Sequence, residues 1–395
     1  MQQKTFDIIL IGATGFTGKR AARYLSRHAP KSLSWGIAAR NPDKLSNVAR
    51  ELNIDEDKYF LVDTLNREQV EKVIQQTKII ITTVGPFSLY GEKVIAACAK
   101  FGTHYLDITG EVGFIKKMKD KYETLAQKSG ALLIPFSGFD SIPADIAAYL
   151  LSKKFDVPEK LNIKAYYSIS GGFNGGTIAT MLNKFESGEY KEMNDPALLM
   201  GNSVQKIHMP THARFFGFDQ NINRWSAPFI MGPINSKVVY TSASEMRKDG
   251  NPYAETIAYS EHSAVGKWYN PIPFLLVSLI LISLTLLGPE KWFRTILKKL
   301  MPAPGEGPTE EQIENGYFKM HAIATDSTNN RVSLKMSYPG DPGNKTTVFL
   351  LCESALCLAL SDKSSHLKSG FLTPISALGQ DLINRLETQG LHIDW

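Results

Sequence analysis

Three glycines near the start of the chain, Gly12, Gly15 and Gly18, have a spacing suited to binding a phosphate group. They lie between the apolar run FDIILI and a segment with helical periodicity, so their loop would begin a helix. Unpaired backbone N–H groups and the positive end of the helix dipole favour an anion there. The alternative is a merely tight turn. We expect a dinucleotide-binding loop formed by these glycines with Thr14, Phe16 and Thr17.

The type of dinucleotide is indicated by the residue that ends the second apolar run, WGIAAR. Enzymes that bind NAD usually have Asp or Glu at this point to hold the ribose 2′-hydroxyl, whereas this chain has Arg40. A guanidinium can pair with a 2′-phosphate and stack on adenine, although a solvated surface arginine is the alternative. We therefore expect NADP(H) as the cofactor. Asp63 could accept a hydrogen bond from adenine, and Gly85 and Pro86 would pass beneath the nicotinamide.

Two later segments, YLDITGE and SGFDSIPAD, place polar side chains where strands of the same sheet would end. Ligands of open α/β sheets lie over the carboxyl ends of the strands. A reduction also needs a group that donates a proton or a hydrogen bond to developing negative charge. We expect this catalytic role for Tyr90, Asp140 and Ser141, with a helix cap as the alternative for Asp140. The residues expected to bind substrate are Asp107, Thr109, Glu111, Gly175 and Thr177.

One pair of residues has the spacing found in a different catalytic site, the Ser-Tyr-Lys proton relay. Tyr149 and Lys153 have the Y-x-x-x-K spacing of short-chain dehydrogenases, and Ser137 lies upstream. The surrounding run IAAYLL favours a tyrosine that packs in the core instead. We therefore expect no proton relay through Tyr149.

The elements that must position these residues form two domains. Residues 1–145 alternate short β-rich runs with helical segments, which is typical of a parallel sheet covered by helices in a Rossmann-type domain. Residues 146–350 contain longer β-rich runs and predict an α+β substrate or dimerisation domain. The runs expected as strands are LNIKAYYSIS, SKVVYTSASE, GYFKMHAIATD and RVSLKMSYPG. Residues 351–395 predict a C-terminal helical part that packs back on the first domain.

Several ordered motifs together resemble a known family. GATGFTG, VGPFSLYGEKVIAACAKFGTHYLDITGE, SGFDSIPAD, the GGT at 175–177 and the PGEGP at 304–308 are similar to the saccharopine-dehydrogenase-like oxidoreductases, which include trans-acting enoyl reductases. The resemblance covers nearly the whole chain. It implies a Rossmann domain, a second domain of the saccharopine-reductase type and NADP(H).

The expected activity is reduction of a C=C or C=N bond of a lipid-like substrate by an NADP-dependent oxidoreductase. Saccharopine chemistry is an alternative, but it must hold several carboxylates and so needs clustered arginines. The arginines between residues 151 and 350 are scattered, at Arg214, Arg224, Arg247, Arg294 and Arg331. A membrane-associated scaffold that binds NADP without catalysis is the second alternative.

Composition limits the other partners. The chain has 395 residues and a net charge of +5, which is too mild for a nucleic-acid surface. No spaced Cys/His cluster suggests a metal, and Cys98, Cys352 and Cys357 lie in apolar segments, which indicates a reduced compartment. The N-terminus lacks the pattern of a cleaved signal peptide. We expect a cytoplasmic protein, with peripheral contact to a membrane.

The segment expected at the membrane is residues 271–301. Its apolar part, 271–288, is shorter than the ~20 residues that span a bilayer. The sequence PEKWFRTILKKLM that follows combines an apolar face with basic residues, as helices at anionic lipid surfaces do. The alternative is a helical pair buried in a homodimer interface or over the substrate.

Overall fold

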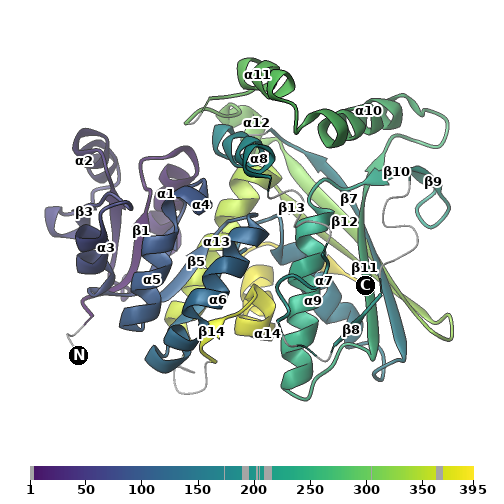
Figure 1. Ribbon diagram of the computed structural model, residues 1–395, viewed down its shortest axis with the longest axis horizontal. Helices are drawn as coiled ribbons and strands as arrows, with labels where there is room; N and C mark the ends of the chain where they lie inside the picture. The colour runs from purple at the N-terminus through teal and green to yellow at the C-terminus, as the bar shows by residue number, and fades with distance from the viewer. Residues whose placement is uncertain are drawn as a thin grey trace.

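The computed structural model describes residues 4–172, 174–188, 195–201, 203, 205–208, 216–303, 305–361 and 368–395. These residues form two β-sheets that lie side by side, as Figure 1 shows. The first sheet is parallel throughout, in the order β14-β6-β5-β4-β1-β2-β3. Its strands are β1 (Phe6–Ile11), β2 (Trp35–Ala39), β3 (Tyr59–Leu61), β4 (Thr77–Thr82), β5 (His104–Asp107), β6 (Leu132–Ile134) and β14 (Gly370–Phe371).

Alternate residues of β1 contact two separate cores. Ile8 and Leu10 pack in the core that includes helix α1, whereas Ile9 and Ile11 pack in the core that includes α3, α5 and α6. Because both faces are buried, the strand reads as a continuous apolar run. The helices that connect these strands are α1 (Phe16–His28), α2 (Pro42–Glu51), α3 (Arg67–Ile74), α4 (Phe87–Tyr90), α5 (Glu92–Phe101) and α6 (Val112–Ser129). Helix α7 (Ile142–Ser152) then leads from β6 to the second sheet.

The second sheet is mixed, in the order β15-β13-β12-β7-β11-β10-β9, with β8 paired to β11. Strands β7 and β11 are parallel, whereas β12 is antiparallel to both β7 and β13. The fold expected from the sequence, a Rossmann-type sheet with a second α+β domain, is confirmed. The strands are β7 (Lys160–Ser170), β8 (Lys206–Ile207), β9 (Gly217–Asp219), β10 (Arg224–Pro228), β11 (Thr256–Val265), β12 (Tyr317–Asp326), β13 (Arg331–Pro339) and β15 (His392–Asp394).

One expected strand is a helix. The segment SKVVYTSASE lies within α9 (Gly232–Lys248), so its prediction as a strand was wrong. Its β-branched residues suit a strand locally, but the helix packs against α7, α14 and β11 at once. Because α9 is buried on several sides, its apolar residues do not show the one-sided period of a surface helix.

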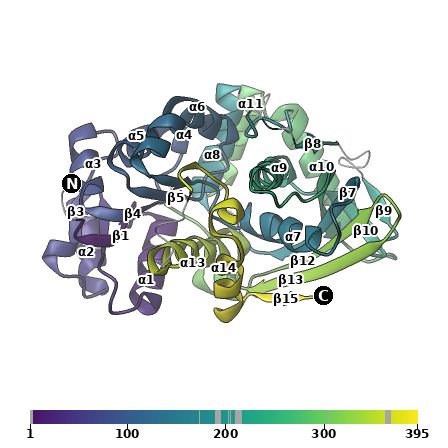
Figure 2. The same ribbon diagram turned by 90° about the horizontal axis from the view of Figure 1, so that it is seen from below.

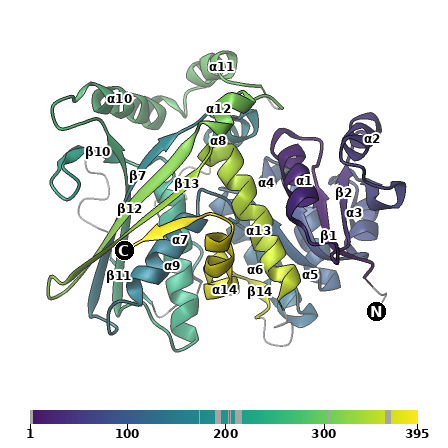
Figure 3. The same cartoon turned by 180° about the vertical axis from the view of Figure 1, so that it is seen from behind.

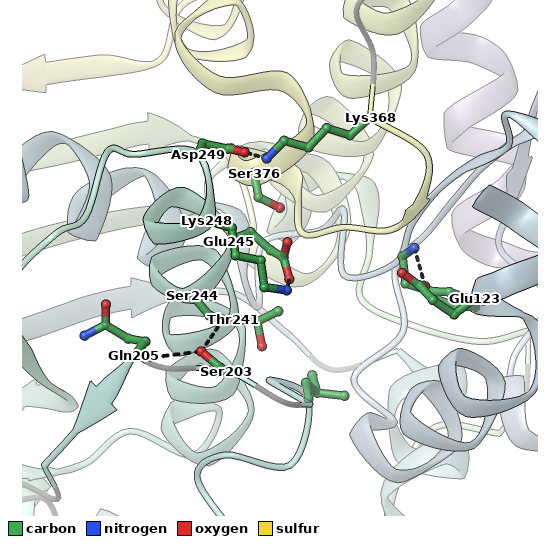
Figure 4. Close-up of polar contacts among 12 residues, drawn as sticks. Glu123, Ser203, Gln205, Thr241, Ser244, Glu245, Lys248, Asp249, Lys368 and Ser376 are labelled. Carbon is green, nitrogen blue, oxygen red and sulfur yellow. Dashed lines mark hydrogen bonds and ion pairs between the residues drawn. The ribbon is translucent and has the colours of Figure 1, made fainter.

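The C-terminal residues contact both sheets. Helix α13 (Thr347–Leu360) lies beside α1 in Figures 2 and 3, β14 extends the first sheet and β15 extends the second. Helix α14 (Pro374–Thr388) begins with a capping box formed by Thr373 and Ser376. Figure 4 shows the neighbouring polar contacts: Lys368 pairs with Asp249 at the end of α9, and the carboxylate of Glu123 accepts a hydrogen bond from the Phe371 backbone N–H.

Four helices lie along one end of the molecule, at the top of Figure 1. They are α8 (Gly175–Ser187), α10 (Ile272–Leu287), α11 (Lys291–Leu300) and α12 (Glu310–Glu314). Leu297 of α11 packs on Ile178 and Leu182 of α8. Within the ranges described above, we find no helix with both the length and the apolarity to cross a membrane.

Candidate functional site

The loop between β1 and α1 can be formed only by glycine at two positions. Gly12 has a φ of +94°, and a Cβ added to Gly18 would lie 2.0 Å from the Gly12 carbonyl oxygen. Gly15 is exposed, and the one atom near its added Cβ is the Gly12 oxygen at 3.4 Å. The loop is therefore closed on the side of the sheet and open on the side where a phosphate would approach.

The N-terminus of α1 fits an anion. The neighbouring helices α2 and α3 are capped by the side chains of Asn41 and Asn66, whereas Gly15 gives α1 no side-chain cap. The first turn of α1 also holds no acidic residue. Its backbone N–H groups and dipole can thus be satisfied by a pyrophosphate, with Thr14, Phe16 and Thr17 around it.

Arg40 and Asp63 follow the ends of strands β2 and β3. Arg40 is exposed, and among the described residues its guanidinium has no hydrogen-bond or ion-pair partner. It can therefore meet a 2′-phosphate without first breaking a contact. The Asp63 carboxylate accepts a hydrogen bond from the Leu65 N–H at 2.9 Å, which forms a local turn. This bond engages one oxygen of the Asp63 carboxylate. The hydrogen bond expected between Asp63 and adenine stays a prediction.

Glu111 holds the turn that follows β4. The peptide between Gly85 and Pro86 is cis, and the next two backbone N–H groups, of Phe87 and Ser88, donate to the Glu111 carboxylate at 2.7 and 3.0 Å. Glu111 is fully buried. Both of its oxygens are engaged, so the carboxylate positions this turn directly, and its expected contact with substrate stays a prediction.

Asp107 ends β5 in a closed hydrogen-bond network. The Tyr105 hydroxyl donates to one of its oxygens at 2.6 Å, and the N–H groups of Thr109 and Phe136 donate to the other at 3.0 and 3.1 Å. Burial raises the pKa of Asp107 to about 7 despite these donors. Thr109 is also buried and accepts a hydrogen bond from the Glu111 N–H. Asp107, Thr109 and Glu111 are thus joined by hydrogen bonds in one buried segment at the carboxyl end of β5.

Ser141 connects the first sheet to the second domain. It stands at the N-cap of α7, but its hydroxyl donates to the side-chain oxygen of Asn235 on α9 at 3.5 Å. The Asn235 amide donates in turn to Glu261 on β11 at 2.8 Å. Asp140, next to Ser141, is half-buried and lies close enough to Glu261 for their charges to interact.

Glu261 is a buried acid that sequence reasoning missed. The hydroxyls of Tyr259 and Tyr167 donate to one of its oxygens at 2.7 and 3.1 Å. Burial raises its pKa to about 7, and the charge of Asp140 acts in the same direction. The sequence signal that could have found it is an alternation along β11. Tyr259, Glu261 and Ser263 lie on one side of this strand, which indicates a polar cluster there.

Helix α8 covers the turn after β4. The Asn183 side chain donates to the Ser88 hydroxyl at 3.1 Å, and a Cβ on Gly85 would lie 3.8 Å from the Thr180 hydroxyl. Gly175 and Thr177 begin this helix, Gly175 buried and Thr177 exposed. Tyr90 is half-buried at the end of α4, within the same region of the sheet. No contact to a substrate can be assigned to these three residues from their positions, so their roles stay predictions.

Two other sequence features are structural. Tyr149 is 6% exposed and packs in the main core, with the Lys153 ammonium over its ring, while the Ser137 hydroxyl donates to the Ile134 carbonyl. The structure therefore gives no proton relay through Tyr149. All three cysteines are buried and free, and no group of His, Cys, Asp or Glu in the described part of the chain could hold a metal.

The comparisons with known proteins agree with this geometry. Residues 8–134 match the saccharopine dehydrogenase NADP-binding domain, so the chain carries an NADP-binding domain. It is 30% identical over 413 residues to the trans-acting enoyl reductase of Mycobacterium tuberculosis, covering 98% of this chain and 97% of the relative. A second M. tuberculosis protein of the same family is 31% identical over 415 residues, covering 99% and 97%. Apo saccharopine dehydrogenase (L-Glu forming) from Saccharomyces cerevisiae shares the fold, with a TM-score of 0.53, 10% identity and coverage of 98% and 99%.

Arg40→Ala should remove most of the preference for NADPH over NADH. A charge-assisted contact to the 2′-phosphate contributes about 1.5–3 kcal/mol, or roughly 10- to 150-fold in affinity. Fluorescence titration with NADPH and with NADH gives the two dissociation constants, whose ratio measures this preference. Arg50→Ala, an exposed arginine on the adjacent helix α2, is the control and should change neither affinity. Equal affinities of the unmodified protein for the two cofactors would contradict the role of Arg40.

Proposed function

Because the chain belongs to the saccharopine-dehydrogenase-like oxidoreductases, the family that includes the trans-acting enoyl reductases, we propose that this NADP-dependent oxidoreductase reduces the C=C bond of a lipid-like acyl substrate. The observation that carries the proposal is similarity over nearly the full length of chain and relative, second domain included. The uncapped glycine loop supports NADPH binding at the first sheet.

The second domain offers little for a substrate with several carboxylates. Arg247 donates to Gln205 and to the Ala254 carbonyl, and Arg331 donates to Asn221. Arg294 donates to backbone carbonyls at the end of α10. Arg214 lies outside the described residues. Arg224, half-buried on β10, makes no hydrogen bond or ion pair within the described residues. Three of the five arginines are thus committed to protein acceptors, and the described part of the second domain holds no cluster of free guanidinium groups, which favours an acyl substrate over saccharopine.

The reduction requires a hydride and a proton on neighbouring carbons. Bound NADPH supplies the hydride. We assign the proton to the cluster around Asp140 and Ser141, because half-buried Asp140 and Ser141 lie together at the start of α7 and hydrogen bonds through Asn235 anchor Ser141 to the buried Glu261. In this scheme Asp140 donates to substrate, Ser141 orients it, and Tyr90 adds a hydrogen bond. Glu261 is a positioning residue: it accepts a hydrogen bond from the Asn235 amide, whose oxygen accepts from Ser141.

The remaining sequence-predicted residues are proposed to shape the substrate side of the site. Glu111 would fix the turn at Gly85 and Pro86 on which the nicotinamide lies. Asp107 and Thr109 would support that turn, and Gly175 and Thr177 would approach the substrate from the start of α8. Backbone held in place in this way keeps the reacting carbons aligned without rearrangement during the reaction.

The outer side chains of α10 and α11 support contact with a membrane. We define the apolar rim as the exposed residues Ile272, Leu275, Leu276, Leu279, Ile280, Ile282, Leu286, Trp292, Ile296 and Leu300. Phe293 and Leu297 of α11 point the other way, toward α8. Lys291, Lys298 and Lys299 of the same helix α11 are exposed, and their positive charges would attract an anionic bilayer surface. A lipid-like substrate could then enter from the bilayer.

An open surface hollow of about 500 Å³ lies next to the rim. Phe218, Asn223, Trp225 and Trp268 line it, and Trp225 stacks on Phe274 at the start of α10 with ring centroids 5.2 Å apart. Exposed Trp268 and Tyr269 continue the apolar surface at this end. Aromatic side chains of this kind favour the interface between lipid and water.

Asp140→Asn and Tyr90→Phe should each lower the rate of NADPH oxidation with an α,β-unsaturated acyl thioester, by about 10²- to 10⁴-fold for Asp140. NADPH affinity should stay within about twofold, because neither residue belongs to the phosphate loop. Tyr149→Phe is the control and should keep its activity, since Tyr149 packs in the core. Activity with saccharopine alone, or loss of turnover in Tyr149→Phe only, would refute the proposed reaction.

The apolar rim should bring the protein to anionic vesicles. Liposome flotation with phosphatidylglycerol-containing vesicles should recover the unmodified protein, and Leu279→Glu/Ile296→Glu should reduce recovery at least tenfold because each inserted side chain contributes about 1.5–3 kcal/mol. Leu125→Glu/Leu360→Glu, on other exposed surfaces, is the matched control. A protein that fails to float, yet forms a dimer that the rim variant abolishes, would show that the rim is a homodimer interface.

A further inference from the structure

The PGEGP motif at 304–308 has no function in the account so far, and it lies against the cofactor loop. Pro304 lies outside the described residues. Residues 305–310, which we call the strap, lie between α11 and the first residue of α12. A Cβ added to Gly307 would lie 2.4 Å from the Phe16 ring. The strap backbone therefore approaches the first residue of α1 more closely than any other residue type would allow.

The shape of the strap is fixed by its own contacts. Gly175 at the start of α8 donates its N–H to the Glu306 carbonyl at 2.9 Å. The Glu306 carboxylate accepts from the Ala303 N–H at 3.0 Å, a local contact at the start of the strap. Pro308 packs on Gly172, where an added Cβ would lie 3.0 Å away. Thr309 then caps α12 in a capping box with Gln312.

Arg20 joins the far end of the strap to the same phenylalanine. Its guanidinium lies 3.9 Å from the centre of the Phe16 ring and forms an ion pair with Glu310. It also donates to the Phe16 carbonyl at 3.0 Å. The second domain thus acts on Phe16 at two points. Gly307 contacts its ring directly, and Glu310 holds Arg20, which lies over the same ring.

We propose that the strap, which belongs to the second domain, is a positioning element of the NADP(H) site. The strap holds Phe16 in place, and the first turn of α1 thereby keeps the geometry that binds the pyrophosphate. The Phe16 N–H belongs to the uncapped turn, so a shift of this residue moves a donor that the cofactor needs. The inference rests on the NADP(H) site and is independent of the acyl substrate proposed above.

The proposal predicts how affinity depends on the cofactor. NADPH and NADH share the pyrophosphate, so a displaced strap weakens both by the same factor, whereas loss of the 2′-phosphate contact weakens NADPH alone. Gly307→Ala should raise the Kd of each about tenfold, measured by fluorescence titration without substrate. Because Leu lacks the ring atoms that the new methyl group would meet, Gly307→Ala/Phe16→Leu should bind both cofactors more tightly than Gly307→Ala.

Glu310→Gln tests the strap without altering its backbone. It removes the charge that pairs with Arg20 and should raise both Kd values about two- to fivefold, with the apo melting temperature unchanged. Glu311→Gln, the next residue of the same helix, is the control and should bind like the unmodified protein. Unchanged affinity in Gly307→Ala, a loss confined to NADPH, or no recovery in the double variant would each overturn the proposal.

Discussion

The close approach of α1 to the end of β1 is the constraint on which the rest of the structure depends. Gly18 brings the helix against the Gly12 carbonyl, and Gly15 leaves the first turn without a cap. An uncapped helix start costs stability unless a ligand satisfies its donors. The loop is thus completed by the phosphates of the cofactor, and Phe16 joins it to the second domain through Gly307 and Arg20.

Buried carboxyl groups organise the site around this loop. Glu111 accepts two backbone N–H groups of the turn after β4, and Asp107 accepts two more beneath it. Such groups are costly to bury unless their partners are complete. Glu261 differs, because three side-chain donors surround it while the Asp140 charge opposes its ionisation. Glu111 therefore fixes the backbone of the turn, whereas Glu261 fixes side chains, namely Asn235 and through it Ser141.

The sequence was sufficient where structure is set by local patterns. The short β-rich runs of the first domain and the glycine spacing follow from short-range rules, and these runs form strands β1 to β6 of the first sheet. It was insufficient where tertiary contacts decide. Val238 and Val239 belong to a helix because α9 is enclosed by other elements, and Glu261 was missed because β11 carries polar residues on a buried face. The contact between Gly307 and Phe16 joins distant segments, and no periodicity indicates it.

Transfer of deuterium from the cofactor to the substrate tests the central claim most directly. NADPH labelled at nicotinamide C4 should be incubated with the protein and an α,β-unsaturated acyl thioester, and the product analysed by mass spectrometry. The account predicts one deuterium at the β-carbon from labelled cofactor and, in D₂O with unlabelled NADPH, one at the α-carbon. A saturated product without cofactor deuterium, or label found only with an imine substrate, would contradict it.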